Sequence, residues 1–185
     1  MVEIQENYKD YDAPRCVLKS VKRFIRHTPK KYLAGLHLIS LTNTDALNRK
    51  ERRKKTLSRK KKVALNNCNG WYEQEWNKRP SRIVLLVDNI LDGCPRWLLK
   101  FNYFSDIELA RTFFHELGHH IHKTQAPEHA EREDVADKWK RRLSRRYFWK
   151  RYWYVMSILL VFRPLLNWIH KKAMQDMERY QNEQG

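Results

Sequence analysis

The chain has 185 residues, enough for one domain or for one domain with an appendage. It carries 38 Lys and Arg against 21 Asp and Glu, a net charge of +17, which favours anionic partners such as nucleic acid or phospholipid headgroups. Its three cysteines form no CxxC pair, and their odd number argues against a disulfide framework. The first residues, MVEIQENYKD, lack the basic and apolar regions of a secretory signal, so we expect a reducing, cytoplasmic location.

The N-terminal half is predicted to contain one helix and three strands. Asp12 followed by Pro14 is typical of a helix start, and apolar residues then recur at helical spacing up to about His27. Three short apolar runs have the length and composition of strands: residues 33–41, 71–76 and 82–88.

A strongly basic run separates the first of these strands from the other two. Residues 49–62, RKERRKKTLSRKKK, contain ten basic residues in fourteen and a net charge of +9. The run has no apolar periodicity, which predicts an exposed loop or a frayed helix within an insertion over residues 49–69. Charge runs are usually solvated, but this one could also bind nucleic-acid phosphates or an anionic membrane surface. The residues that would make such contacts are Arg52, Arg53, Lys54, Lys55, Arg59, Lys60, Lys61 and Lys62.

The most informative stretch is histidine-rich and reads FFHELGHHIHK at 113–123. The pattern Ser105-Asp106-Ile107-Glu108 is typical of a capping box, so we expect a helix to begin at Ser105 and to carry this stretch. A further helix is predicted over about 128–146, followed by a basic, aromatic and mostly helical extension over 147–185. The apolar residues of the first of these helices share one face: Ala110, Phe113, Phe114, Leu117 and Ile121.

The histidine spacing predicts a metal site. His115 and His119 are four residues apart, so both imidazoles leave the same side of the helix, about opposite its apolar face. Two nitrogens so placed can hold one Zn²⁺ ion, which prefers tetrahedral nitrogen and oxygen ligands. Glu116 projects beside them, where it can accept a proton from a metal-bound water as the general base. Gly118 removes a side chain beside the second ligand, which allows a neighbouring backbone to approach closely.

A catalytic zinc site needs a third protein ligand, with the fourth position left for water. Glu133 and Asp137 lie fourteen and eighteen residues after His119 and share one face of the next predicted helix. We predict that Glu133 is the ligand and that Asp137 accepts the outer N–H of a ligating histidine. The alternatives are Asp137, His122 or His129 as the third ligand, or a solvent-facing role for both acidic residues.

The motifs HELGH at 115–119 and EDVAD at 133–137 together resemble the zincin metallopeptidases of the gluzincin branch, whose pattern is HExxH and then ExxxD on the next helix. EDVAD is especially similar to the ExxAD form of the neprilysin-like members. The resemblance implies an α+β, zincin-like core over residues 1–146 with a small twisted sheet, an active-site helix and a glutamate helix. It also implies hydrolysis of a peptide or protein substrate by zinc-activated water, with the substrate extended along a sheet edge.

The sequence also bears on the branch of the family and on the residue that stabilises the oxyanion. Gln125 stands where the metzincin branch has a third histidine, which disfavours that branch. The residue that would stabilise the tetrahedral oxyanion is not identified by spacing, and the candidates are His129, Tyr147 and Tyr152.

The C-terminal extension contains an apolar run that could pack in a core or contact a membrane. Its apolar run, residues 152–162, is shorter than the ~20 residues that a membrane span needs, so core packing and an interfacial membrane helix both remain. The leading hypothesis is a cytoplasmic zinc metallopeptidase. One alternative is a zincin that associates with nucleic acid, or is regulatory, and acts on one partner protein. Another is a protease held peripherally at a membrane surface.

Overall fold

The structure is a computed structural model of the chain and describes residues 2–58, 61–76, 80–125, 133–155 and 157. The chain divides into two units, Met1–Tyr147 and Phe148–Gly185. The boundary falls one residue later than predicted, because Tyr147 packs in the core of the first unit. The first unit mixes helices and strands, which confirms the α+β class.

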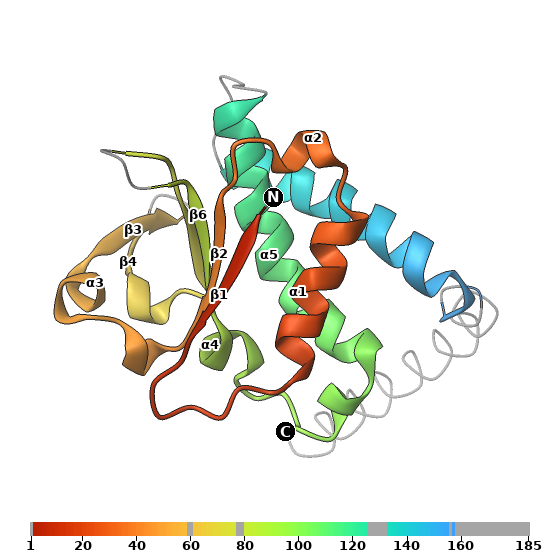
Figure 1. Cartoon of the computed structure of the whole chain (residues 1–185), viewed down its shortest axis with the longest axis horizontal. Helices are drawn as coiled ribbons and strands as arrows, with labels where there is room; N and C mark the ends of the chain where they lie inside the picture. The colour runs from red at the N-terminus through yellow and green to blue at the C-terminus, as the bar shows by residue number, and fades with distance from the viewer. Residues whose placement is uncertain (1, 59–60, 77–79, 126–132, 156, 158–185) are drawn as a thin grey trace, which may run out of the picture. The chain divides into compact units, whose positions relative to one another are not determined.

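Four strands of the first unit form one mixed sheet (Figure 1). They are β1 Glu3–Asn7, β2 Leu38–Thr42, β5 Gly70–Glu73 and β6 Arg82–Leu86. Their order across the sheet is β1-β2-β6-β5, with the first three parallel and β5 antiparallel to β6. The central strands β2 and β6 are apolar and largely buried, as expected for parallel strands covered on both faces. β5 lies at an edge of the sheet.

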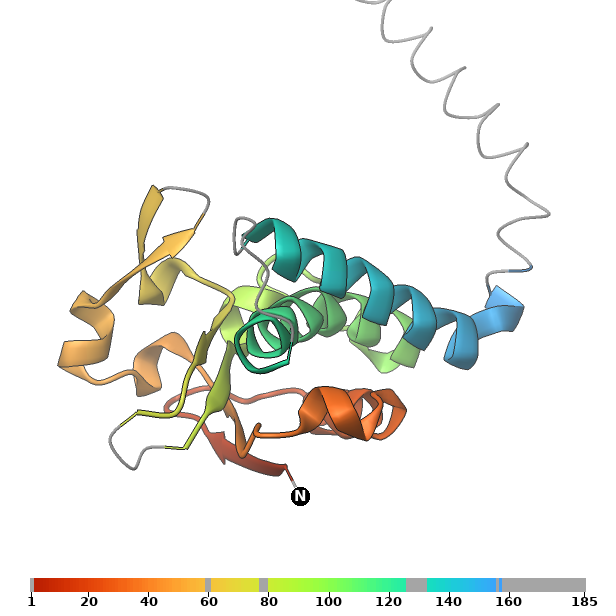
Figure 2. The ribbon, with the colours of Figure 1, turned by 90° about the horizontal axis from the view of Figure 1, so that it is seen from above.

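Helices pack against one face of this sheet. The longer ones in the first unit are α1 Cys16–His27 and α5 Asn102–Thr124, and residues 133–147 are also helical. Figure 2 shows α5 between α1 and the 133–147 helix. Shorter helical elements connect the strands and helices: α2 Lys30–Leu33, η1 Thr44–Ala46, α3 Arg49–Arg53, η2 Leu65–Asn67, α4 Val87–Leu91 and η3 Leu98–Lys100.

A buried charge network ties the three helices together. Phe24 of α1 lies 5.3 Å from Phe113 of α5 and 5.0 Å from Tyr147, measured between ring centroids. Beside these rings, fully buried Asp106 accepts the Tyr147 hydroxyl and pairs with Arg23, whose Nε lies 3.3 Å from Asp106 Oδ2. A buried carboxylate is tolerated only when it is paired and hydrogen-bonded, so these three side chains stabilise one another.

The described side chains of the basic run are mostly exposed, as predicted, but the run forms a short capped helix and two paired strands rather than a loop or a frayed helix. Its first part forms α3, which begins at a capping box. The Asn48 side chain accepts the Glu51 N–H at 2.9 Å, and the Glu51 carboxylate accepts the Asn48 N–H at 3.1 Å. These two hydrogen bonds satisfy donors that a helix start would otherwise leave without partners.

The second part of the run forms a hairpin. β3 Lys55–Ser58 pairs antiparallel with β4 Lys61–Ala64. Directly after β4, Leu65 is buried in an apolar cluster that includes residues of β5 and β6. This anchor lies outside the charged run, so the composition of the run did not predict it. The members of the cluster are Leu47, Leu65, Trp71, Val84 and Leu86.

Several strands begin or end at residues other than those predicted. β1 was not predicted, because Ile4 is its one apolar residue. β2 begins at Leu38 rather than residue 33, since α2 precedes it and Gly35, with φ of +80°, turns the chain between them. β6 ends at Leu86 because α4 follows at once. The strand predicted at 71–76 corresponds to β5, which begins at Gly70 and ends at Glu73.

Two of the three predicted helix starts were wrong by a few residues, and the third, at about residue 128, lies outside the described residues. α1 begins at Cys16, past the expected start at Asp12. α5 begins at Asn102, so Ser105 does not cap it. Ser105 instead lies fully buried in the first turn, where its hydroxyl donates to the Asn102 carbonyl at 3.1 Å.

The C-terminal extension is described only in part. Residues 148–155 and 157 are helical, while most of the predicted apolar run and everything after it lie outside the described residues. In the part of the chain that the structure describes, no helix is both long enough and apolar enough to cross a membrane.

Candidate metal centre

The candidate site is built on the middle of α5. The apolar residues predicted to share one face, such as Phe113 and Leu117, are buried against the rest of the first unit. His115 and His119 leave the other side, with about a fifth of each side chain exposed: 21% and 18%. Their rings lie 4.8 Å apart between centroids and nearly perpendicular, at 87°. Local helix geometry therefore brings the two imidazoles together, as the spacing predicted.

Glu133 on the next helix lies against both histidines. Its Oε2 is 3.4 Å from His115 Nε2, and its Oε1 is 3.7 Å from His119 Nε2. The three side chains can offer one ligand atom each, all within 4.8 Å of one another. Two ligands at ~2.1 Å from a tetrahedral zinc ion are about 3.4 Å apart. The donor types fit zinc, and the two distances from Glu133 to the histidines are close to this spacing.

Gly118 explains how the second helix comes so close. A Cβ added to Gly118 would lie 2.7 Å from the carbonyl oxygen of Ala136 and 2.9 Å from its Cα. Only a residue without a side chain lets the Ala136 backbone approach α5 to this distance. Ala136 is three residues after Glu133, so the close contact sets the position of that carboxylate, in agreement with the role predicted for Gly118.

Asp137 contacts the outer side of the first histidine. Its Oδ1 lies 3.1 Å from His115 Nδ1, the ring nitrogen that does not face Glu133. The same oxygen accepts Lys140 Nζ at 2.6 Å, which holds the carboxylate in place. A hydrogen bond at Nδ1 keeps a proton on that nitrogen and leaves Nε2 free to bind a cation.

Glu116 is buried beside the three ligand candidates. Burial, followed by the negative charge of Glu133, raises the pKa of Glu116 to about 8, while a hydrogen bond from the backbone of Tyr72 favours the ionised form. A divalent cation bound to Glu133 would reverse the second of these causes and lower the Glu116 pKa. Glu116 therefore lies next to the site and is hydrogen-bonded by the backbone of β5, but it is not one of the three candidate ligands.

The second histidine is held in its neutral form. Burial, followed by the proximity of His115, lowers the pKa of His119 to about 4. A neutral imidazole is the form that binds metal, so His119 needs to release no proton near pH 7.

Other predicted candidates have different positions. His122 is buried on α5 and does not belong to the converging trio. His129 lies outside the described residues. Tyr147 is a weaker candidate for the oxyanion, because its hydroxyl donates to Asp106 in the core. Tyr152 belongs to the second unit.

Some of the basic residues predicted to bind polyanions contact other residues of the chain. Arg52 donates to the Asp45 and Leu47 carbonyls at 2.9 and 3.0 Å, and Lys54 Nζ lies 3.5 Å from Glu73. Five of the eight are described as exposed: Arg52, Arg53, Lys54, Lys55 and Lys62. Arg59 and Lys60 lie outside the described residues, and so does the side chain of Lys61. Their binding role stays a prediction.

Sequence reasoning missed the contribution of β5. Besides its backbone bond to Glu116, Tyr72 places its hydroxyl 3.2 Å from His120 Nδ1, and His120 Nε2 lies 3.0 Å from the Ala34 carbonyl. His120 is thus a buried histidine that links α5 to the edge strand. No local signal predicts this contact, because the paired residues are 48 positions apart.

None of the comparisons with known proteins, whether with family models, curated proteins or solved structures, gives a match to this chain. The functional interpretation therefore depends on the residues of the site and on their geometry.

Proposed function

We propose that the chain is a zinc-dependent metallopeptidase, with His115, His119 and Glu133 as the zinc ligands and Glu116 as the general base. The observation that carries the proposal is the convergence of two histidine nitrogens and one carboxylate from separate helices, at 3.4 and 3.7 Å. The placement of Asp137 on the outer nitrogen of His115 also supports the gluzincin-like pattern of ligand and supporting carboxylate.

The chemistry divides between the cation and the protein. A zinc ion at this site would supply a Lewis acid that polarises a peptide carbonyl and lowers the pKa of water towards neutral. Glu116 takes a proton from the attacking water and delivers it to the nitrogen of the leaving amine. Asp137 fixes the orientation of His115, and burial excludes bulk water from Glu116.

The edge strand suggests where a substrate lies. β5 ends the sheet, and its Tyr72 backbone reaches Glu116. An extended peptide that pairs with this edge would run past the general base, held by backbone hydrogen bonds that do not depend on its side chains. The proposal therefore includes a peptide or unfolded protein segment as the substrate.

Zinc binding tests the ligand set. We expect one zinc per chain, lost on His115→Ala or His119→Ala. Glu133→Ala should weaken zinc binding more than Asp137→Ala, which should cost about 10- to 100-fold as a supporting residue. The exposed neighbour Asp134 supplies a matched control, because Asp134→Ala removes the same charge one residue away from Glu133. Equal zinc affinity in the Glu133 and Asp134 variants would remove Glu133 from the site.

Peptide cleavage tests the reaction. The zinc-loaded chain should hydrolyse members of a pool of quenched fluorescent peptides, and chelation should stop it. Glu116→Gln should keep zinc but lose at least about 100-fold in rate, the lower range for a positioned general base, because an amide cannot accept the proton. Cleavage at the wild-type rate by this variant would show that Glu116 is not the base.

A further inference from the structure

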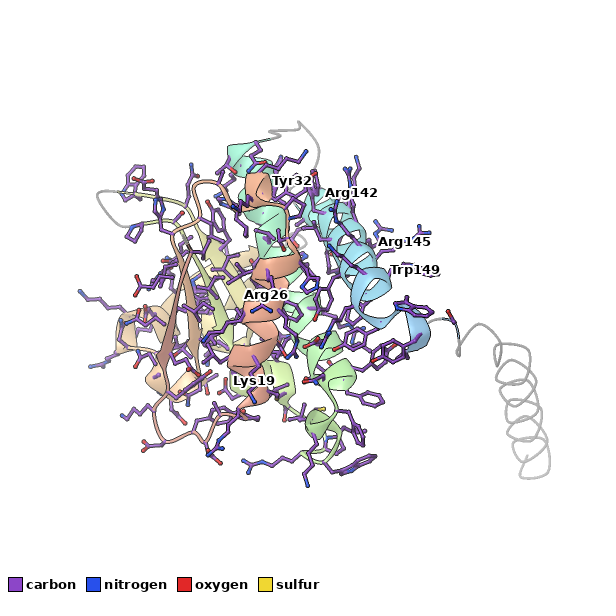
Figure 3. The ribbon with its side chains drawn as sticks, turned by 45° about the vertical axis from the view of Figure 1, so that its right-hand side comes forward. Lys19, Arg26, Tyr32, Arg142, Arg145 and Trp149 are labelled. Carbon is purple, nitrogen blue, oxygen red and sulfur yellow. The ribbon has the colours of Figure 1, made fainter. Side chains whose placement is uncertain are left out.

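A basic stripe runs along the solvent side of α1. The helix buries Val17, Val21 and Phe24 on one side, so its other side faces solvent. The exposed side contains only cations in its charged positions, and α1 and α2 contain no acidic residue. Lys19 and Arg26 point outward from it in Figure 3. The exposed basic residues of the two helices are Lys19, Lys22, Arg26, Lys30 and Lys31.

A second basic stripe follows the 133–147 helix. Residues 138–147, KWKRRLSRRY, contain no acidic residue. Its exposed cations recur at intervals of three and four, so they share a face that differs from the one carrying Glu133 and Asp137. Figure 3 shows Arg142 and Arg145 in the same view as the α1 stripe. The exposed basic residues on this helix are Lys138, Arg141, Arg142, Arg145 and Arg146.

Aromatic contacts join the two stripes into one face. Tyr147 packs against His27 at the end of α1, with ring centroids 5.4 Å apart. Tyr32 of α2 packs edge-on against Trp139 at 5.0 Å. A cation covers each of these two rings: Lys31 Nζ lies 5.0 Å from the Tyr32 centroid, and the Arg142 guanidinium lies 5.1 Å from that of Trp139. Stacking holds the Arg142 fork in place, so less side-chain entropy is lost when it binds an anion.

The composition of the face favours phosphates over lipid. A surface that enters a membrane presents exposed apolar side chains. Here Val17, Val21 and Phe24 of α1 are buried, and other apolar and aromatic side chains of the face are half-buried: Leu18, Ile25, Tyr32 and Trp139. Because cations cover the Tyr32 and Trp139 rings, these rings are poorly placed to stack on bases. This disfavours single-stranded nucleic acid as the ligand. Planar arginine forks match phosphate oxygens well. From Lys19 to Arg26 the stripe spans ~10 Å, a length over which duplex DNA carries about six phosphate charges.

We propose that the face formed by α1, α2 and residues 138–147 binds duplex nucleic acid through its phosphates, without reading base sequence. This inference does not depend on the metal site. It also differs from the predicted role of the basic run, whose elements α3, β3 and β4 lie on the opposite side of the sheet from α1 (Figures 1 and 2).

The test measures binding of the full chain to a labelled mixed-sequence duplex of about 25 base pairs over a salt series. Neutralising Z phosphates gives a log–log salt slope of about −0.9Z for a duplex, so each lost contact should make the slope shallower by about one. We expect the variant Lys22→Ala/Arg142→Ala/Arg145→Ala to bind at least tenfold more weakly, with a slope shallower by about three. Chelation of metal should change neither value.

A matched variant removes three charges from the basic run: Arg53→Ala/Lys55→Ala/Lys62→Ala. If it loses affinity and slope while the first variant binds as the wild type does, the run is the binding site and the proposal fails. Vesicles containing about a third phosphatidylserine test the alternative. Loss of vesicle binding in the first variant, with duplex binding unchanged, would identify the face as a membrane contact. A wild-type chain that does not bind duplex at moderate salt would also overturn the proposal.

Discussion

The substitution Gly118→Ala tests how the metal centre is assembled, without changing any proposed ligand. The added Cβ would lie 2.7 Å from the Ala136 carbonyl oxygen, whereas ordinary van der Waals contact begins at 3.4 Å. The difference, 3.4 − 2.7 = 0.7 Å, is the separation that the two helices must gain. The obstacle is backbone on one helix and Cβ on the other, so no side-chain rotation can relieve it.

The displacement should weaken zinc binding more than it weakens the fold. Metal–ligand distances tolerate only about ±0.2 Å, so a shift of this size would pull Glu133 away from the two histidines. We expect zinc affinity to fall at least about tenfold, the size of effect produced by losing a supporting residue. On stability, alanine favours the helix by about 1 kcal/mol over glycine, and overpacking costs about 1–3 kcal/mol. The net loss should lie between zero and about 2 kcal/mol.

Zinc affinity should be measured by competition with a chelator, and stability by urea unfolding of the metal-free chain. Arg111→Ala, which changes an exposed residue of the same helix, serves as the control and should leave both quantities unchanged. If Gly118→Ala binds zinc as the wild type does and is more stable, the close contact with Ala136 does not position Glu133, and this account of the site is wrong.

Three further predictions concern stability. Zinc at about 100 times its Kd should add ~2.7 kcal/mol to the free energy of unfolding and raise Tm by about 5–10 °C in calorimetry. The Tm of Glu133→Ala should change little when zinc is added. Arg23→Ala should cost about 3–5 kcal/mol in urea unfolding because it leaves Asp106 buried without its cation, and a loss below 1 kcal/mol would contradict that. Leu65→Ala should cost about 2–5 kcal/mol, since Leu65 anchors the basic hairpin. A negligible change in the free energy of unfolding would show that Leu65 does not stabilise the hairpin.

The local part of the site could be predicted from the sequence, since helix geometry alone determines it. Residues four apart on a helix share a side, so His115 and His119 had to meet once α5 formed. Their convergence with Glu133 needs the crossing of two helices, and spacing left Glu133 and Asp137 close in rank. The deciding feature is the contact of Gly118 with the Ala136 backbone, which depends on the packing of elements separated in the chain.

Errors of prediction arose where distant partners decided the structure. The capping-box pattern at Ser105 lies inside α5, because η3 and Phe101 start the helix earlier and Asp106 is used by Arg23 and Tyr147. Charge alone suggested an exposed loop or a frayed helix at 49–62, although the helix start depends on Asn48 and the hairpin on Leu65. Both residues border the basic run, outside the window in which its charge was counted.

The two proposals meet on one helix. Residues Glu133 and Asp137 of the 133–147 helix face α5, while its exposed arginines face solvent. Under both proposals, the helix that completes the metal centre also binds a duplex. The side chains at the metal centre and those that contact the duplex are different residues. Binding to nucleic acid would then act on cleavage through local concentration, since a protein substrate bound to the same duplex meets the site at a far higher effective concentration than a free one. Such an arrangement would restrict the substrate by location rather than by a specificity pocket.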